Sequence, residues 1–185
     1  FSDRPLTPDN PGPQAARYHG YLRALADAGV AADPGWLFVG SRALEGGREM
    51  AHRLVEQYPD RTSRPSAVVA FNDRTAVGAL RGFYELGIRV PDEVAVVGFH
   101  GLASGCYTTP ALTSIEHPRV ELGEMAAESL FTLLEGGEID VRDRIVPVSL
   151  VVRESCGAQL VGARRTIVAA TVNGPTDGPV GDGLG

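Results

Sequence analysis

The chain has 185 residues, of which 43% are hydrophobic and 22% charged, as in a globular domain or a domain and a fraction. Its net charge is -6 and it has no dense cluster of Lys and Arg, which argues against a DNA-binding surface within these residues. No run approaches the roughly 18 consecutive apolar residues of a membrane-spanning helix, so we expect no membrane partner.

The first third of the chain predicts two helices and a short strand. Residues 1–13 are rich in Pro and Asn, which indicates a loop. A helix is expected over 13–28, where apolar residues recur at a spacing of about 3.6. The apolar run Trp36–Val39 predicts a strand, and residues 47–58 predict a second helix that ends before Pro59.

A strand–helix–strand unit follows and determines the predicted fold class. Ala67–Phe71 is apolar without alternation, as expected of a strand that is covered on both faces. Asn72 or Asp73 can cap a helix over 74–86, because a short side-chain oxygen accepts hydrogen bonds from the unpaired N–H groups of a first turn. Val94–Val97 is the second strand. Because such a crossover joins parallel strands, we predict an open, mostly parallel α/β sheet with helices on both faces.

The remainder of the chain predicts two strands and a helix. The strands are expected over 112–115 and 145–152, and an amphipathic helix over 119–135. From Gly157 onward, Gly, Ala, Thr and Pro dominate, which predicts a disordered tail over 157–185. The apolar patch 166–172 is the part of that tail in which a strand could form.

Polar side chains follow both strands of the strand–helix–strand unit. One strand leads into Asn72 and Asp73, and the other into His100 and Gly101. In open α/β sheets, ligands bind in the crevice beyond the carboxyl ends of the strands. Amide, carboxylate and imidazole groups suit a ligand that carries hydroxyl or amide groups. The alternative is that Asn72 and Asp73 only cap the helix, and the two roles can coexist.

Motifs of the common enzyme classes are missing from the sequence. There is no Gly-x-Ser-x-Gly, no phosphate-binding Gly-x-x-x-x-Gly-Lys, and no Gly-x-Gly-x-x-Gly after a strand. The four histidines have no metal-ligand spacing, and Cys106 and Cys156 are interpreted as buried or idle thiols. We therefore expect no enzymatic activity, no metal and no cofactor, and the residues alone indicate a small-molecule-binding α/β domain.

Four stretches of the sequence match a known family in the expected order. They are PSAVVAFND at 65–73, GIRVPDEVAVVGF at 87–99, TPALTSI at 109–115 and LVVRES at 150–155. With them, roughly residues 14–156 resemble the lactose/galactose repressor family of transcriptional regulators.

The resemblance implies a DNA-binding regulator whose effector-binding core has two lobes, like the periplasmic sugar-binding proteins. Effector binding between the lobes would change operator affinity, and operator DNA would be bound by a helix-turn-helix domain absent from this chain. Residues 1–115 and 141–156 would form the second lobe, and 116–140 a return helix of the first lobe. The regulator would be cytoplasmic and homodimeric. The alternative is a periplasmic or lipoprotein solute-binding protein of a sugar transporter, although the closing residues 150–155 favour the regulator.

By position, the effector site of the family falls on Arg17, Arg42, Asn72, Asp73 and His100. Arg17 matches an Arg that commonly contacts effector, and Asn72 an Asn that hydrogen-bonds it. Arg42 stands where several members have an aromatic ring, and His100 where they typically have the first of two Asp residues. Since these departures make the pocket more cationic, we hypothesise an anionic effector, such as a sugar phosphate or sugar acid. A lost sugar site and a neutral sugar are the alternatives.

The resemblance also implies a dimer interface. It would involve the helix over 74–86 and the segment 104–108. The residues concerned are Arg74, Val77, Arg81, Cys106 and Tyr107. The alternative is that the helix only packs on the sheet, because a single amphipathic face is compatible with both arrangements.

Overall fold

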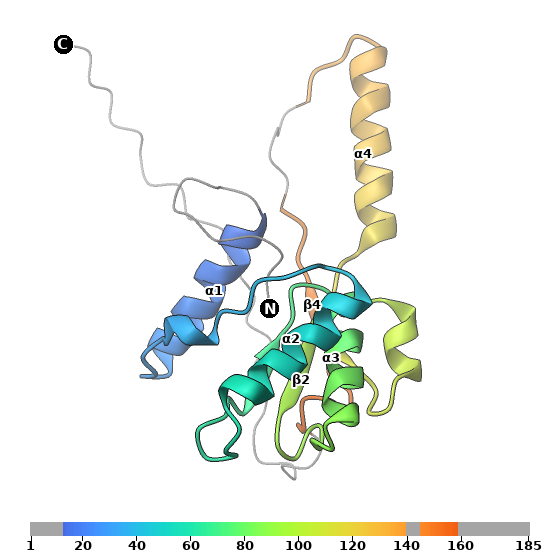
Figure 1. Cartoon of the computed structure of the whole chain (residues 1–185). Coiled ribbons are helices and arrows are strands. Elements are labelled where there is room, and N and C mark those ends of the chain that lie inside the picture. The colour runs from blue at the N-terminus through green and yellow to red at the C-terminus, as the bar shows by residue number, and fades with distance from the viewer. Residues whose placement is uncertain (1–12, 140–144, 159–185) are drawn as a thin grey trace, which may run out of the picture. The chain divides into compact units, whose positions relative to one another are not determined.

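The computed structural model describes residues 13–139 and 145–158 (Figure 1). These residues fall into two compact units, 13–116 with 150–158 and 117–139 with 145–149. The elements are α1 (Pro13–Asp27), η1 (Pro34–Trp36), α2 (Leu44–Gln57), β1 (Ala67–Val69), α3 (Asp73–Glu85), β2 (Ala95–His100), η2 (Ala103–Tyr107), β3 (Thr113–Glu116), α4 (Arg119–Leu134) and β4 (Ser149–Val151). None of the described helices is long and apolar enough to cross a membrane.

The four strands form one sheet in the order β1-β2-β3-β4. β1 and β2 are parallel, with Val68 opposite Val96, and β2 and β3 are parallel, with Phe99 opposite Ile115. The chain connects β1 to β2 through α3, so the predicted strand–helix–strand unit is confirmed. The fold is the predicted open, mostly parallel α/β sheet.

The hydrophobic core lies under α2 and α3, which pack side by side (Figure 1). Two glycines allow this close approach. A Cβ at Gly78 of α3 would overlap the backbone carbonyl of Leu44, and a Cβ at Gly47 of α2 would overlap that of Thr75. The largest buried apolar side chains of this core are Phe38, Met50, Leu54, Val68, Leu80, Phe83, Val94, Val96 and Leu112.

The strand predicted over Trp36–Val39 is wrong. Pro34–Trp36 forms a 3-10 helix instead, and Val39 makes only an isolated bridge. The reason is local, because the Asp33 side chain accepts a hydrogen bond from the Gly35 N–H at 2.7 Å and Pro34 supplies a helix-compatible φ.

The burial predicted for β1 is also wrong in one respect. Val68 is 5% exposed, but Val69 on the opposite face is 52% exposed. Since successive side chains of a strand point to opposite faces, the helices that bury Val68 cannot reach Val69. The last strand is shorter than predicted and begins at Ser149 instead of Ile145.

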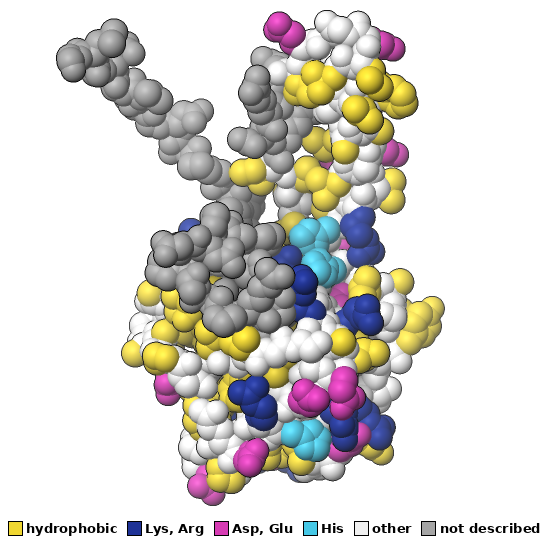
Figure 2. Space-filling view, turned by 45° about the horizontal axis from the view of Figure 1, so that its top comes forward, with side chains coloured by type: hydrophobic (Ala, Val, Ile, Leu, Met, Phe, Trp, Pro, Cys, Tyr) yellow, Lys and Arg dark blue, Asp and Glu magenta, His cyan; other side chains and the backbone are white. Residues whose placement is uncertain are grey.

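The helix α4 matches the predicted 119–135 helix, but none of its side chains is buried. Val120, Leu130, Phe131 and Leu134 are 76%, 56%, 63% and 72% exposed. Figure 2 shows hydrophobic side chains on the surface of this segment. The loop expected over 1–12 and the tail from 159, with its expected strand over 166–172, lie outside the described residues.

Candidate functional site

Two aromatic rings at the carboxyl ends of β1 and β2 contact one guanidinium group. Phe71 follows β1 and Phe99 lies near the end of β2, and parallel pairing brings these strand ends together. Arg17 of α1 places its Cζ 4.5 Å from the centre of the Phe71 ring and 3.8 Å from that of Phe99. Both distances are within the range of a cation–π interaction, so this cation lies at the strand ends where the sequence predicts the ligand crevice.

The polar contacts of Arg17 are to neutral groups. Its Nη1 donates a hydrogen bond to the Phe71 carbonyl oxygen at 2.7 Å, and its Nη2 lies 3.4 Å from His100 Nε2. A guanidinium has only donors, so this contact is a hydrogen bond in the tautomer whose Nε2 carries no proton. Burial of the half-buried Arg17 lowers its pKa from the ordinary value.

A strained turn places His100 beside Arg17. His100 has φ 114°, a region that non-glycine residues rarely occupy, and Gly101 follows with φ 63°. Asp73 stabilises the turn, because its carboxylate accepts hydrogen bonds from the Leu102 N–H and the Ser114 hydroxyl. The same hydroxyl oxygen accepts the Gly101 N–H at 3.1 Å.

Asp73, which is expected to face the ligand, is buried beside the turn that holds His100. Its side chain is 1% exposed and both of its oxygens are engaged in the turn. These contacts give Asp73 a positioning role in the turn, and its expected contact with effector stays a prediction. Sequence reasoning missed its partner Ser114, which no local motif distinguishes from any other strand serine.

Asn72 and Arg42 lie close to each other near Phe71. The Asn72 Oδ1 accepts the Thr75 N–H at 2.8 Å, so the predicted capping role is confirmed. The Asn72 Nδ2 lies 3.4 Å from the Arg42 carbonyl oxygen, which its N–H group can reach. The exposed Arg42 places its Cζ 5.7 Å from the centre of the Phe71 ring. The structure thus joins Arg17 to Phe71 and His100, and Asn72 to Arg42, which lies near the same Phe71 ring.

Comparison with known proteins identifies the fold. Residues 5–156 match the periplasmic binding protein-like domain family. The chain belongs to this family. A curated relative is the HTH-type transcriptional repressor PurR of Mannheimia succiniciproducens, which is 35% identical over 139 residues. That match covers 75% of this chain but only 40% of the relative, so the domain spans less than half the length of that repressor.

Solved structures agree with this result. A putative transcriptional regulator of the LacI family from Sanguibacter keddieii has a TM-score of 0.74 at 35% identity, over 85% of this chain and 57% of that one. A sugar-binding transcriptional regulator of the same family from Escherichia coli, complexed with phosphate, has a TM-score of 0.69 at 32% identity, over 80% and 51%. The resemblance to the lactose repressor family is thereby confirmed, and it favours a regulator over a transport protein.

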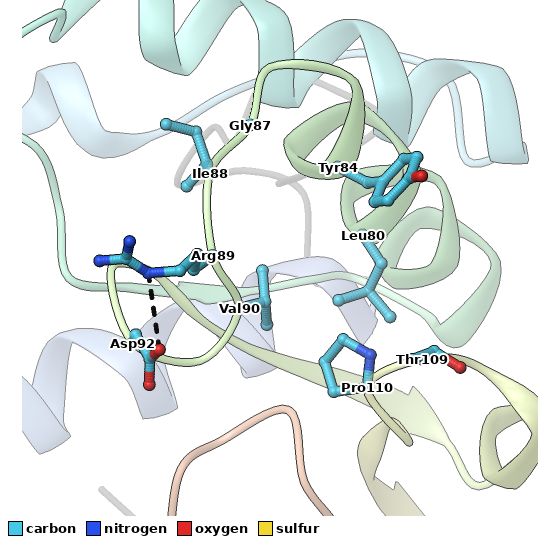
Figure 3. A pocket seen from close by; sticks show the side chains of 9 residues that line it. All are labelled: Leu80, Tyr84, Gly87, Ile88, Arg89, Val90, Asp92, Thr109 and Pro110. Atoms are coloured by element: carbon cyan, nitrogen blue, oxygen red, sulfur yellow. Dashed lines mark ion pairs between the residues drawn. The ribbon is translucent and has the colours of Figure 1, made fainter.

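A separate pocket of about 390 Å³ lies at the C-terminal end of α3 (Figure 3). Its lining residues are Leu80, Tyr84, Gly87, Ile88, Arg89, Val90, Asp92, Thr109 and Pro110. The Nε of Arg89 pairs with Asp92 Oδ2 and with Glu93 Oε2, each at 3.6 Å. The cation of this pocket is therefore balanced by neighbouring carboxylates, and none of the residues expected to bind effector lines it.

The residues expected at a dimer interface lie mostly on the surface of this periplasmic-binding-protein-like domain. Arg74 and Arg81 are exposed along α3 and Val77 is half-buried. Cys106 and Tyr107 are exposed in η2, the latter at 86%. The opposite side of α3 is buried against the core, so the packing role of this helix is confirmed. Sequence reasoning missed Tyr84, which is 74% exposed and one turn beyond Arg81 on the same helix.

The described part of the chain offers no cluster of metal-ligating side chains. No group of three or more His, Cys, Asp or Glu side chains there could hold a metal ion. Cys106 is exposed and Cys156 is half-buried, and both are free thiols.

Proposed function

We propose that this chain is the effector-binding and dimerisation portion of a DNA-binding transcriptional repressor. A small molecule binds in the crevice at the ends of β1 and β2, and its binding changes the affinity for operator DNA. The observation that carries the proposal is the group of Arg17, Asn72 and His100 around Phe71, in a domain whose relatives are repressors. Both strand ends of an open α/β sheet converge there, which is where such folds bind ligands.

The chemistry of the crevice suits a small polar ligand. Arg17 and Arg42 provide N–H donors, and the Phe71 ring provides an apolar surface. Recognition by binding, without a catalytic step, agrees with the repressor names of the relatives. The solved relative that contains phosphate is itself described as sugar-binding.

The rest of the proposed regulator follows the family pattern. We assign residues 1–115 and 141–156 to the second lobe and 116–140, with α4, to a return helix of the first lobe. The unit with the sheet makes up most of this second lobe, whose residues 145–149 fall in the other unit. This chain has a net charge of -6, which does not suit contacts with DNA phosphates. Operator DNA would therefore be bound, in the cytoplasm, by a different domain. The exposed side of α3, with Arg74, Val77 and Arg81, would form a homodimer together with Cys106 and Tyr107.

The proposal is tested on the complete gene product. Genomic DNA fragments that bind to the protein are isolated and sequenced. The affinity of the protein for these fragments is then measured by fluorescence anisotropy, with and without a panel of sugars, sugar acids and sugar phosphates. We expect one operator-like sequence and at least one compound that changes affinity for it. Arg17→Gln should remove the response to the compound and keep DNA binding, whereas Arg23→Gln, a charge removed from an exposed site on the same helix, should keep both. A protein that selects no sequence would contradict the proposal.

A further inference from the structure

Arg17 is a half-buried cation that no described carboxylate balances. Its contacts are the Phe71 carbonyl oxygen, the His100 ring nitrogen and two aromatic faces. Taking a charge out of water is costly unless an opposite charge or good hydrogen bonds replace the water. Ring faces and neutral acceptors replace only part of that hydration, so this cation remains a strong site for an anion.

Two carboxylates lie next to the His100 turn, and neither has a described hydrogen bond or ion pair with Arg17. Asp73 is buried, and its oxygens accept the Leu102 N–H and the Ser114 hydroxyl. Glu116 lies opposite His100 in the β2–β3 register, and its carbon atoms pack along Gly101. It is exposed to water and forms no ion pair with Arg17 among the described residues. His100 offers Arg17 an acceptor but no negative charge.

The guanidinium keeps donors available for a ligand. Of its five N–H groups, the carbonyl of Phe71 takes one and the ring of His100 one, which leaves about three. A carboxylate or a phosphate can accept two parallel N–H bonds from one guanidinium, an arrangement stronger than hydrogen bonds to neutral oxygens. Arg42 places a second guanidinium 5.7 Å from the centre of the Phe71 ring.

We propose that the effector carries an anionic group, a carboxylate or a phosphate, that pairs with Arg17. The proposal rests on the proposed function, because it names the chemistry of the ligand at that same site. A neutral sugar would leave the charge of Arg17 unbalanced, whereas a sugar acid or sugar phosphate would neutralise it. His100 and Asn72 then remain to bind the uncharged part of the ligand.

Calorimetric titration of the complete gene product without DNA tests this proposal. The probes are matched triplets, each made of a neutral sugar, the corresponding sugar acid and the corresponding sugar phosphate. Comparing the affinities of the acid and the phosphate shows which anionic group the site prefers. We expect an anionic member to bind at least about tenfold more tightly than its neutral parent. Equal or tighter binding of the neutral parent would overturn the proposal, and so would the failure of every anionic member to bind at millimolar concentration.

Three variants connect the preference to this site. Arg17→Gln should abolish the preference for the anion, and the surface variant Arg23→Gln should retain it. His100→Asp places a carboxylate beside Arg17, so it should weaken binding of the anion at least about tenfold more than it weakens binding of the neutral parent. If Arg17→Gln fails to fold, His100→Asp still decides the matter, because an unchanged preference in that variant contradicts pairing with Arg17.

The two proposals fail in different ways in these measurements. An anionic ligand that binds without changing operator affinity contradicts the proposed function only. A neutral sugar that binds tightly and releases operator DNA contradicts the anionic effector only.

Discussion

Arg17 Nη1 donates a hydrogen bond to the Phe71 carbonyl oxygen at 2.7 Å, across 54 positions of sequence. This bond joins α1 to the end of β1, and the Phe71 and Phe99 rings stack on the same guanidinium. One side chain thus both attaches a helix and supplies the charge of the crevice. The attachment can be tested apart from ligand binding.

Arg17→Ala should loosen α1 from the sheet. The change removes a hydrogen bond and two cation–π contacts at a partly exposed site, so we expect the free energy of unfolding to fall by about 1 kcal/mol. Hydrogen exchange should show faster exchange in α1 and little change in α3. Equal exchange in α1 of the variant and the wild type would show that this contact does not hold the helix.

Asp73→Ala should be more destabilising than Arg17→Ala. It leaves the half-buried Leu102 N–H and the buried Ser114 hydroxyl without their acceptor, which should cost about 2–3 kcal/mol in urea denaturation. Ser114→Ala leaves the carboxylate with one partner and should cost less, about 1 kcal/mol. If Asp73→Ala lowered the free energy of unfolding by less than Ser114→Ala does, the positioning role of Asp73 would be contradicted.

Glu85 makes stability depend on pH through an exposed ionic network. Hydrogen bonds from Arg81, Arg48 and His52 lower its pKa from 4.5 to about 2. Because the folded pKa is depressed, the stabilising contribution is present above 4.5 and is lost as the pH falls through about 2. Thermal midpoints of the wild type and of Glu85→Gln should therefore differ at neutral pH and converge across that interval. The difference should shrink in high salt, and a difference constant with pH would refute the network.

Gly78→Ala should strongly destabilise the domain. The added Cβ overlaps the Leu44 carbonyl, so α2 and α3 must move apart, at an expected cost of about 2–3 kcal/mol in the free energy of unfolding. Gly20→Ala is the matched control, because no atom lies within 4 Å of a Cβ at that position in α1. There the better helix propensity of Ala should stabilise the domain by about 0.5–1 kcal/mol. Equal effects of the two changes would contradict the helix packing.

Tyr107→Ser tests the proposed dimer surface. Tyr107 is 86% exposed, so its removal should leave folding unchanged while weakening self-association at least about tenfold in sedimentation equilibrium. Leu44→Ser removes an apolar side chain that is 49% exposed on α2 and should leave association unchanged. A dimer unaffected by Tyr107→Ser would place the interface elsewhere.

Local patterns predicted much of this fold correctly, because their physical causes act over a few residues. The spacing of apolar residues predicted α1, α2 and α4, and the short side chain of Asn72 predicted the start of α3. Parallel pairing of β1 and β2 followed from the helix between them, and with it the convergence of Phe71 and Phe99–His100. The same local patterns did not predict the 3-10 helix at Pro34, where a capped proline turn prevails over an apolar run.

The tertiary structure decided how the individual side chains of the site are used. Nothing near Asp73 in the sequence shows that its carboxylate is enclosed by Leu102 and Ser114, because those partners are brought in by separate elements. The stacking of Arg17 between two rings likewise requires three distant segments to meet. By itself the sequence determined which residues gather at the strand ends. Their roles depend on burial and on the geometry of hydrogen bonds, which exist only once the chain is folded.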